Sequence, residues 1–223
     1  MARFPQPACE KGSQKWIQRL INDRPEHLNS QIRAKLNLSG DEHIQWLSPL
    51  KDDEYSEYRD QAFVDLLGVK LKEKLLTDFW PKRGPQWDAL GKSSSGKLFL
   101  VEAKSHIREL ISTMQVKDEN SARTIHKSLQ EVKRFLGSNA EIDWSCGFYQ
   151  YVNRLAHLCL LRQNRLPAYL LFVYFINDSE MKGPTSIHEW KGAIELLHSY
   201  LGIRRHKLKD FVTDVFIDIR CLQ

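Results

Sequence analysis

The stretch from Gly84 to His106 constrains the fold more than any other part of this 223-residue chain. It reads as two short strands joined by a turn, because residues 91–96 combine two glycines with three serines, which supply the backbone freedom that a chain reversal needs. The second strand, 97–104, carries apolar side chains on both of its faces. This pattern predicts a strand that is buried on each side.

Three charged residues interrupt this apolar hairpin. Glu102 and Lys104 are two positions apart on the second strand, so they point to the same face. Asp88 lies on the first strand, and antiparallel pairing about the turn would bring it near Glu102. Charges on buried strands need an ionic partner, water or a metal ion. The alternative, a strand-end salt bridge with Asp88 at a solvated edge, leaves the convergence of three charges unexplained.

An aspartate followed by Glu-x-Lys on the next strand is the arrangement of the PD-(D/E)xK nuclease superfamily, which has the restriction-endonuclease-like fold. The chain resembles this superfamily through Pro-Gln-Trp-Asp, which ends at Asp88, and Glu-Ala-Lys, which ends at Lys104. It departs from the pattern in one respect, because Pro85 stands three residues before the aspartate rather than next to it. The resemblance covers residues 51–178 as a succession of elements, but only the hairpin carries specific residues.

Phosphodiester hydrolysis needs a divalent cation, and Mg²⁺ is satisfied by one or two carboxylates together with water. The resemblance implies that Asp88 and Glu102 hold Mg²⁺, for which we expect Mn²⁺ to substitute, with the carbonyl of Ala103 as a third ligand. It also implies that Lys104 orients or deprotonates the attacking water. We therefore expect a metal-dependent nuclease that acts on DNA.

A further acid is expected from the segment before the hairpin. Residues 51–67 show helical spacing and Gly68 is a natural stop, so we predict the first helix of the core here. In many members of the superfamily such a helix sends one more acid to the metal, and Glu57 is our choice by position, with Glu54 second. A solvated helix acid is the alternative, because periodicity does not fix which face meets the metal.

Candidate nucleic-acid contacts surround the motif. Lys82 and Arg83 precede the hairpin, Gln86 shares a face with Asp88, and His106 continues the face of Glu102 and Lys104. Arg123 and Lys127 follow one side of a helix predicted over 121–136. Gln150 and Arg154 belong to a polar stripe on a helix predicted over 143–162. Solvated surface charges or an interhelical hydrogen-bonded seam are the alternatives. In chain order the candidates are Lys82, Arg83, Gln86, His106, Arg123, Lys127, Gln150 and Arg154.

The remaining pattern predicts an α/β fold, namely a restriction-endonuclease-like core over residues 51–223 with a central mixed sheet flanked by helices. Residues 1–50 read as a helical N-terminal extension that pads this core. Further strands are expected at 69–80, 168–177 and 212–219, a core helix at 187–201, and helices of the extension at 14–21 and 26–36.

Composition limits the partners that the chain can have. Its net charge of +5 permits nucleic-acid binding without requiring it. No apolar run is long enough to span a membrane, and four scattered cysteines indicate neither zinc nor disulfides. We expect a cytoplasmic protein that binds DNA, has no membrane partner, and forms a homodimer if it cuts both strands. The alternatives are a catalytically idle nucleic-acid-binding or interaction module on the same fold and a metal-dependent hydrolase with another substrate.

Overall fold

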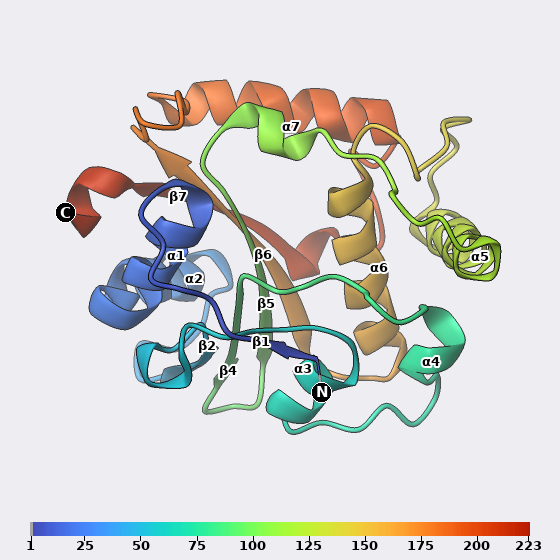
Figure 1. The fold of residues 1–223 in the computed structure, drawn as a ribbon, viewed down its shortest axis with the longest axis horizontal. Helices are drawn as coiled ribbons and strands as arrows, with labels where there is room; N and C mark the ends of the chain where they lie inside the picture. The colour runs from blue at the N-terminus through green and yellow to red at the C-terminus, as the bar shows by residue number, and fades with distance from the viewer. Residues whose placement is uncertain (1) are drawn as a thin grey trace.

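The structure is a computed structural model that describes residues 2–223. At its centre is a five-stranded mixed sheet. β2, β4 and β5 are antiparallel neighbours, whereas β5–β6 and β6–β7 are parallel pairs. The prediction of an α/β fold with a mixed central sheet flanked by helices is thus confirmed (Figure 1). The strands lie in the order β2 (Ile44–Ser48), β4 (Ala89–Ser93), β5 (Leu98–Lys104), β6 (Ala168–Ile176) and β7 (Val212–Asp218).

Two N-terminal helices cover one face of the sheet. α1 (Gly12–Asp23) and α2 (Pro25–Lys35) lie side by side there, and their apolar side chains pack against strand residues such as Phe99 and Val101. Because side chains alternate along a strand, Ala103 also points to this face. The residues of β5 that alternate with Phe99, Val101 and Ala103, including Glu102, point to the opposite face.

Three longer helices cover that opposite face. They are α5 (Glu119–Leu136), α6 (Tyr149–Gln163) and α7 (Ile187–Leu201). α6 lies directly against β6 and is buried on nearly all sides. Glu102 and Lys104 therefore point from β5 into the layer between the sheet and α6.

Short elements connect this framework. β1 and β3 form a separate two-stranded antiparallel sheet, and the others are single turns of α-helix or 3₁₀-helix. No helix within residues 2–223 is both long and apolar enough to cross a membrane. The short elements are β1 (Arg3–Phe4), η1 (Lys51–Asp53), β3 (Glu57–Tyr58), α3 (Asp60–Leu66), α4 (Leu76–Phe79), η2 (Ile107–Leu110), η3 (Lys209–Phe211) and η4 (Ile219–Leu222).

The segment before the hairpin differs from its prediction. The helix predicted over 51–67 begins only at Asp60, because Glu54 and Tyr55 have φ of 53° and 49°, which no right-handed helix accommodates. The strand predicted over 69–80 is wrong, since this segment is a loop that ends in α4. Its apolar residues pack individually against the helical layer and pair with no other strand.

Other predicted boundaries also differ from those in the structure. The predicted helical extension, residues 1–50, contains α1 and α2 but also supplies β2 to the central sheet, so it is not only helical. The helix predicted to start at Asp143 begins at Tyr149, after Gly147 with φ of 78°. In the hairpin, β4 runs from Ala89 through to Ser93, so the turn is shorter than predicted.

The other predicted elements are present within a few residues of their expected ends. They are the two N-terminal helices, the second strand of the hairpin, the two later strands and the helices over 121–136 and 187–201. These segments combine clear periodicity with a recognisable end, such as the left-handed Gly137 and Gly202 that follow α5 and α7.

Candidate functional site

Asp88 lies immediately before β4, next to Glu102 of β5. The register pairs Ala89 with Val101, which brings the preceding residue, Asp88, opposite Glu102. A hydrogen bond from the backbone N–H of Ala103 to Asp88 Oδ2, 2.6 Å long, fixes the carboxylate at this point. The hairpin thus brings the predicted aspartate and glutamate together.

Glu102 and Lys104 form a buried ion pair. Lys104 Nζ donates to Glu102 Oε1 at 2.5 Å and to Gln150 Oε1 at 3.0 Å. Both charged residues are nearly inaccessible, with exposed fractions of 2% for Glu102 and 8% for Lys104. Lys104 therefore has a fixed position and two of its hydrogens are already directed to acceptors.

Arg154, from α6, completes this ionic network. Its Nε donates to Glu102 Oε2 at 2.6 Å, and its Nη2 donates to the carbonyl of Gln86 at 2.9 Å. Its guanidinium also lies over the ring of Trp87, 5.0 Å from the ring centre. The predicted polar stripe of α6 therefore contributes Arg154 to Glu102 and Gln150 to Lys104.

Glu57 reaches the same group of acids from β3. Its Oε2 accepts from Gln86 Nε2 at 2.5 Å and its Oε1 from Gln14 Nε2 at 2.8 Å. Only 4% of Glu57 is exposed, whereas the alternative acid Glu54 is largely exposed and pairs with Arg3. The choice of Glu57 over Glu54 agrees with this placement, although Glu57 lies on a short strand rather than on a helix.

The acids in this group outnumber the cations. Burial raises the pKa of Asp88 well above its ordinary value, and the carboxylates of Glu102 and Glu57 raise it further. Burial also raises the pKa of Glu57, and this effect outweighs the hydrogen bonds from Gln14 and Gln86, which lower it. Asp88 is therefore held beside two other acids with Lys104 as the nearest compensating charge.

Glu102 and Lys104 are each stabilised in the charged form. Burial opposes the charge on Glu102, but Arg154 and Lys104 outweigh it and leave the pKa of the carboxyl below its usual value. Burial likewise opposes the charge on Lys104, and the carboxylates of Glu102 and Asp88 outweigh it, which raises the pKa of the ammonium. At neutral pH the pair is an ion pair.

Asp88 and Glu102 are the residues that would hold a Mg²⁺ ion here, and they do not form a complete cage. No cluster of three or more His, Cys, Asp or Glu side chains among residues 2–223 is arranged to hold a metal. Mg²⁺ needs only one or two carboxylates, because water fills its remaining positions. Like Glu57, Asp88 has a raised pKa, and its Oδ1 has no hydrogen bond within residues 2–223. Glu102 can join it where Lys104 or Arg154 releases an oxygen.

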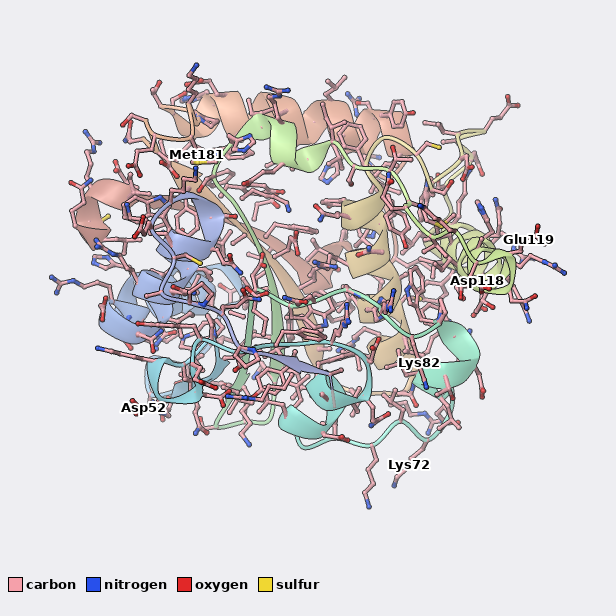
Figure 2. All side chains as sticks on the ribbon, in the orientation of Figure 1. Asp52, Lys72, Lys82, Asp118, Glu119 and Met181 are labelled. Atoms are coloured by element: carbon pink, nitrogen blue, oxygen red, sulfur yellow. The ribbon has the colours of Figure 1, made fainter. Side chains whose placement is uncertain are left out.

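A cleft of about 1230 Å³ opens above this network. Its floor includes Gln86, Arg154 and Gln150, which bind Glu57, Glu102 and Lys104 respectively. Lys82 and Arg83, predicted as nucleic-acid contacts, lie on one wall, and Figure 2 shows Lys82 beside α4. Five of the eight predicted nucleic-acid contacts thus line one cleft.

Asp60 fixes the basic wall of the cleft. Its Oδ1 accepts from the N–H of Gly84 at 2.8 Å, and its Oδ2 accepts from the N–H of Arg83 at 3.1 Å. Arg83 has φ of 69°, a left-handed conformation that needs such support. Asp60 therefore supports the wall of the cleft.

The opposite wall is the loop that follows η2. Its Ser112 donates from its N–H to the carbonyl of Gly147 at 2.7 Å, and its hydroxyl accepts from the N–H of Gln150 at 2.8 Å. The residue that contacts Lys104 is thus tied to the wall of the cleft.

Three predicted contacts lie outside the cleft. His106 caps η2 and its Nε2 lies 3.5 Å from Glu109. Arg123 and Lys127 are exposed on α5, and Arg123 pairs with Glu119 on the same helix. α5 contributes only Ser121 and Ile125 to the lining.

Gln14 is a site residue that the sequence pattern does not indicate. This glutamine comes from α1, far from the motif in sequence, and its hydrogen bond to Glu57 depends on how α1 packs on the sheet. The partly exposed helix position it occupies has no feature that would distinguish it from a solvated glutamine. The fold alone places it beside the acids.

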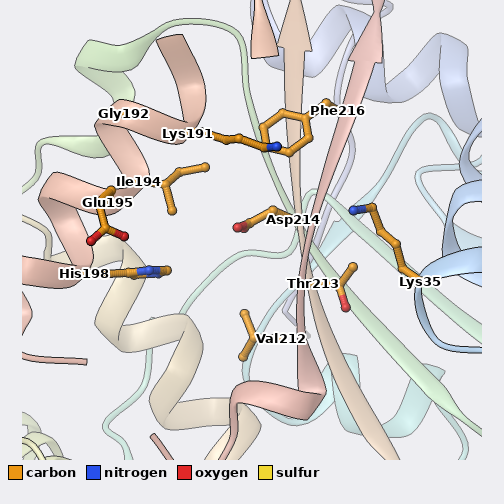
Figure 3. A pocket seen from close by; sticks show the side chains of 10 residues that line it. All are labelled: Lys35, Lys191, Gly192, Ile194, Glu195, His198, Val212, Thr213, Asp214 and Phe216. Carbon is orange, nitrogen blue, oxygen red and sulfur yellow. The ribbon is translucent and has the colours of Figure 1, made fainter. Parts of the chain in front are cut away.

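A second hollow, of about 820 Å³, lies between α7 and the edge strand β7 (Figure 3). Asp214 lines it and lies on the same sheet face as Glu102, because the register pairs Glu102 with Phe172 and Phe172 with Asp214. Burial raises the pKa of Asp214 to about 6. Phe172 separates this hollow from the acids, so it is no part of the first site.

The chain matches no family model, no curated protein and no solved structure. The function proposed next therefore rests on the geometry of the site.

Proposed function

We propose that the protein is a Mg²⁺-dependent nuclease of the PD-(D/E)xK superfamily, with the restriction-endonuclease-like fold, and that it hydrolyses phosphodiester bonds in DNA. The observation that carries this proposal is the meeting of Asp88, Glu102 and Lys104 in one buried group, directly behind the residues Gln86, Gln150 and Arg154 that line a cleft. The proposal includes a cytoplasmic setting and, where both strands are cut, a homodimer.

In this proposal Asp88 and Glu102 hold the ion, and Mn²⁺ can replace Mg²⁺. Bound there, the ion supplies a Lewis acid that polarises the phosphate and lowers the pKa of a water. Asp88 is already fixed by the N–H of Ala103, so its carboxylate needs little reorganisation to bind. The carboxylate of Glu57 lies close enough to Asp88 and Glu102 for its charge to act on both, and it accepts a hydrogen bond from Gln86.

Lys104 orients the attacking water in this scheme rather than removing its proton. Its pKa is raised, so at neutral pH the ammonium has no lone pair to accept a proton. Two of its hydrogens are directed to Glu102 and Gln150, which leaves the third for water or for a phosphate oxygen. Arg154, already paired with Glu102, adds a second positive charge at the floor of the cleft.

A second candidate is an idle nucleic-acid-binding module. Both oxygens of Glu102 are engaged by Lys104 and Arg154, and a buried ion pair of this kind can serve structure alone. Salt-sensitive DNA binding without cutting would favour this candidate.

A cutting assay separates the two. Plasmid and single-stranded DNA are incubated with the protein in Mg²⁺, in Mn²⁺ and in EDTA. We expect cutting only with a divalent cation, and a loss of roughly 100-fold or more in Asp88→Asn and Lys104→Gln, since each removes a group that acts at the reacting phosphate.

The matched control is Glu54→Gln, because Glu54 is an exposed acid that pairs with Arg3 away from the cleft. It should cut like the original protein. Cutting that survives in Asp88→Asn, or cutting in EDTA, would contradict the proposal.

A further inference from the structure

The cleft has two ordered walls of different chemistry. The first is the basic loop that contains Lys82 and Arg83, fixed by Asp60. The second is the loop from Ile111 to Lys117, held by backbone hydrogen bonds to the segment before α6. Because both walls are fixed, the shape of the cleft is set before a ligand binds.

The cations Lys82, Arg83 and Lys117 on these walls outnumber Asp118, the one carboxylate among residues 2–223 that lines the cleft. No carboxylate among residues 2–223 lies within ion-pair distance of Lys82, Arg83 or Lys117. All three residues are exposed and line the cleft. Such a set of free cations is complementary to several phosphates in a row.

Exposed apolar side chains lie among these cations. Ile111 is 66% exposed and Val116 is 38% exposed, and both line the cleft next to Lys117. The half-buried ring of Tyr149 lines it as well. A duplex presents phosphates, sugars and base edges but hides the flat faces of its bases in the stack. Apolar side chains in a cationic cleft therefore match unstacked bases.

The acids are recessed behind the floor of this cleft. Glu102 is 2% exposed and Lys104 is 8% exposed, and Gln86, Gln150 and Arg154 lie between them and the opening. A duplex is a wide, stiff rod, so its backbone would meet the rims before a phosphate approached these groups. A single strand is narrow and flexible enough to enter.

We infer that the cleft binds a single-stranded polynucleotide, such as a frayed end or an unpaired segment, in preference to a duplex. Phosphates contact Lys82, Arg83 and Lys117, and bases pack on Ile111 and Val116. The inference rests on the proposed nuclease function, because it names the substrate class of the same site. DNA and RNA strands share this chemistry, and the test includes both.

Binding is measured in EDTA, where no cutting occurs. A labelled strand of roughly 12 nucleotides, within the usual range of single-strand sites, is titrated by fluorescence anisotropy as DNA, as RNA and as the DNA duplex of the same sequence. We expect at least one single strand to bind about fivefold or more tightly than the duplex. A duplex that binds as tightly as both strands would overturn the inference.

Two sets of variants test which side chains contact the bases and which contact the phosphates. Ile111→Ala with Val116→Ala should weaken single-strand binding about fivefold and leave duplex binding unchanged, since base packing is lost. Leu196→Ala, on the exposed side of α7 with the same 66% exposure as Ile111, is the control and should change neither. An unchanged single-strand affinity in the double variant would overturn the assignment of the bases to this wall.

The second set removes the three cations. Lys82→Ala, Arg83→Ala and Lys117→Ala together should reduce the slope of log affinity against log salt by about 2, since each single-strand phosphate contact contributes about 0.7. The control is Lys70→Ala with Lys72→Ala, exposed lysines outside the cleft; Figure 2 shows Lys72 at the edge of the molecule. An unchanged slope would place the phosphates elsewhere and overturn the inference.

The two proposals fail in different ways. A protein that prefers single strands in EDTA but cuts nothing in Mg²⁺ would refute the nuclease function and leave the binding inference in place. A protein that cuts duplex DNA in Mg²⁺ and binds duplex best in EDTA would support the nuclease function and refute the binding inference.

Discussion

At the scale of single residues, the fold places the carboxylate of Asp88 close to the carboxylates of Glu102 and Glu57. Burial and the charges of Glu102 and Glu57 raise its pKa, so the folded state binds a proton that the unfolded state releases near its ordinary pKa of 3.8. The contribution of Asp88 to the free energy of unfolding therefore falls as pH rises from that value through the raised pKa. At neutral pH a charged Asp88 destabilises the fold unless a cation shares the site.

Replacing Asp88 with asparagine should therefore stabilise the metal-free protein. Asparagine can keep the hydrogen bond from Ala103 and removes the repulsion, so we expect a gain of about 0.5–2 kcal/mol in the free energy of unfolding at neutral pH in EDTA. The gain should shrink as pH is lowered and Asp88 becomes protonated. Denaturant unfolding across pH measures it.

The exposed Asp52, at the edge of the molecule in Figure 2, gives the matched control. Asp52→Asn should leave the free energy of unfolding unchanged at each pH. A loss of stability in Asp88→Asn at neutral pH would mean that the charge on Asp88 is compensated within the protein, contrary to this account.

The core of the site could be predicted because its residues are close in sequence. Asp88, Glu102 and Lys104 belong to one hairpin, and alternation along a strand fixes which residues share a face. Gln14 could not be predicted, because its contact with Glu57 depends on the packing of α1.

At the scale of elements, β2 depends on the absence of a side chain at Gly91. Trp46 of β2 lies over this glycine, and an added Cβ would lie 2.8 Å from the Trp46 ring and 3.1 Å from the Gln45 carbonyl oxygen. Trp46 is held on its other side by Asn29 of α2, whose Oδ1 accepts from the indole N–H at 3.0 Å. The ring has little freedom to move away.

Gly91→Ala should therefore weaken the attachment of β2 and lower the free energy of unfolding by about 1–3 kcal/mol. Gly40→Ala is the control, since nothing lies within 4 Å of its added Cβ, and it should have almost no effect. Urea unfolding of both variants measures the difference. Equal stability of the two would show that β2 is not packed against β4 as described.

The elements that sequence reasoning found are those with strong periodicity and clear ends. β2 is not predicted, because five residues do not show whether a partner strand exists. The helix predicted over 51–67 is interrupted by the positive φ of Glu54 and Tyr55, which the apparently helical pattern does not reveal. The strand predicted over 69–80 has apolar residues but pairs with no strand of residues 2–223.

At the scale of the whole molecule, the site is assembled from segments that are spread between Gln14 and Arg154 in the sequence. α1 contributes Gln14, β3 contributes Glu57, the hairpin contributes its two acids and lysine, and α6 contributes Gln150 and Arg154. The cleft then forms between two loops that are distant in sequence. Such a site exists only in the folded chain, and sequence alone could indicate its members but not the cleft between them.

The most direct test is a crystal structure of the protein with Mn²⁺ present, with the ion located by its anomalous scattering. We predict one peak bound by an oxygen of Asp88 and an oxygen of Glu102, each at about 2.1–2.2 Å, with Arg154 or Lys104 displaced from Glu102. Glu102 still bonded to both cations, with no Mn²⁺ at Asp88, would contradict the central claim that these acids hold the catalytic metal.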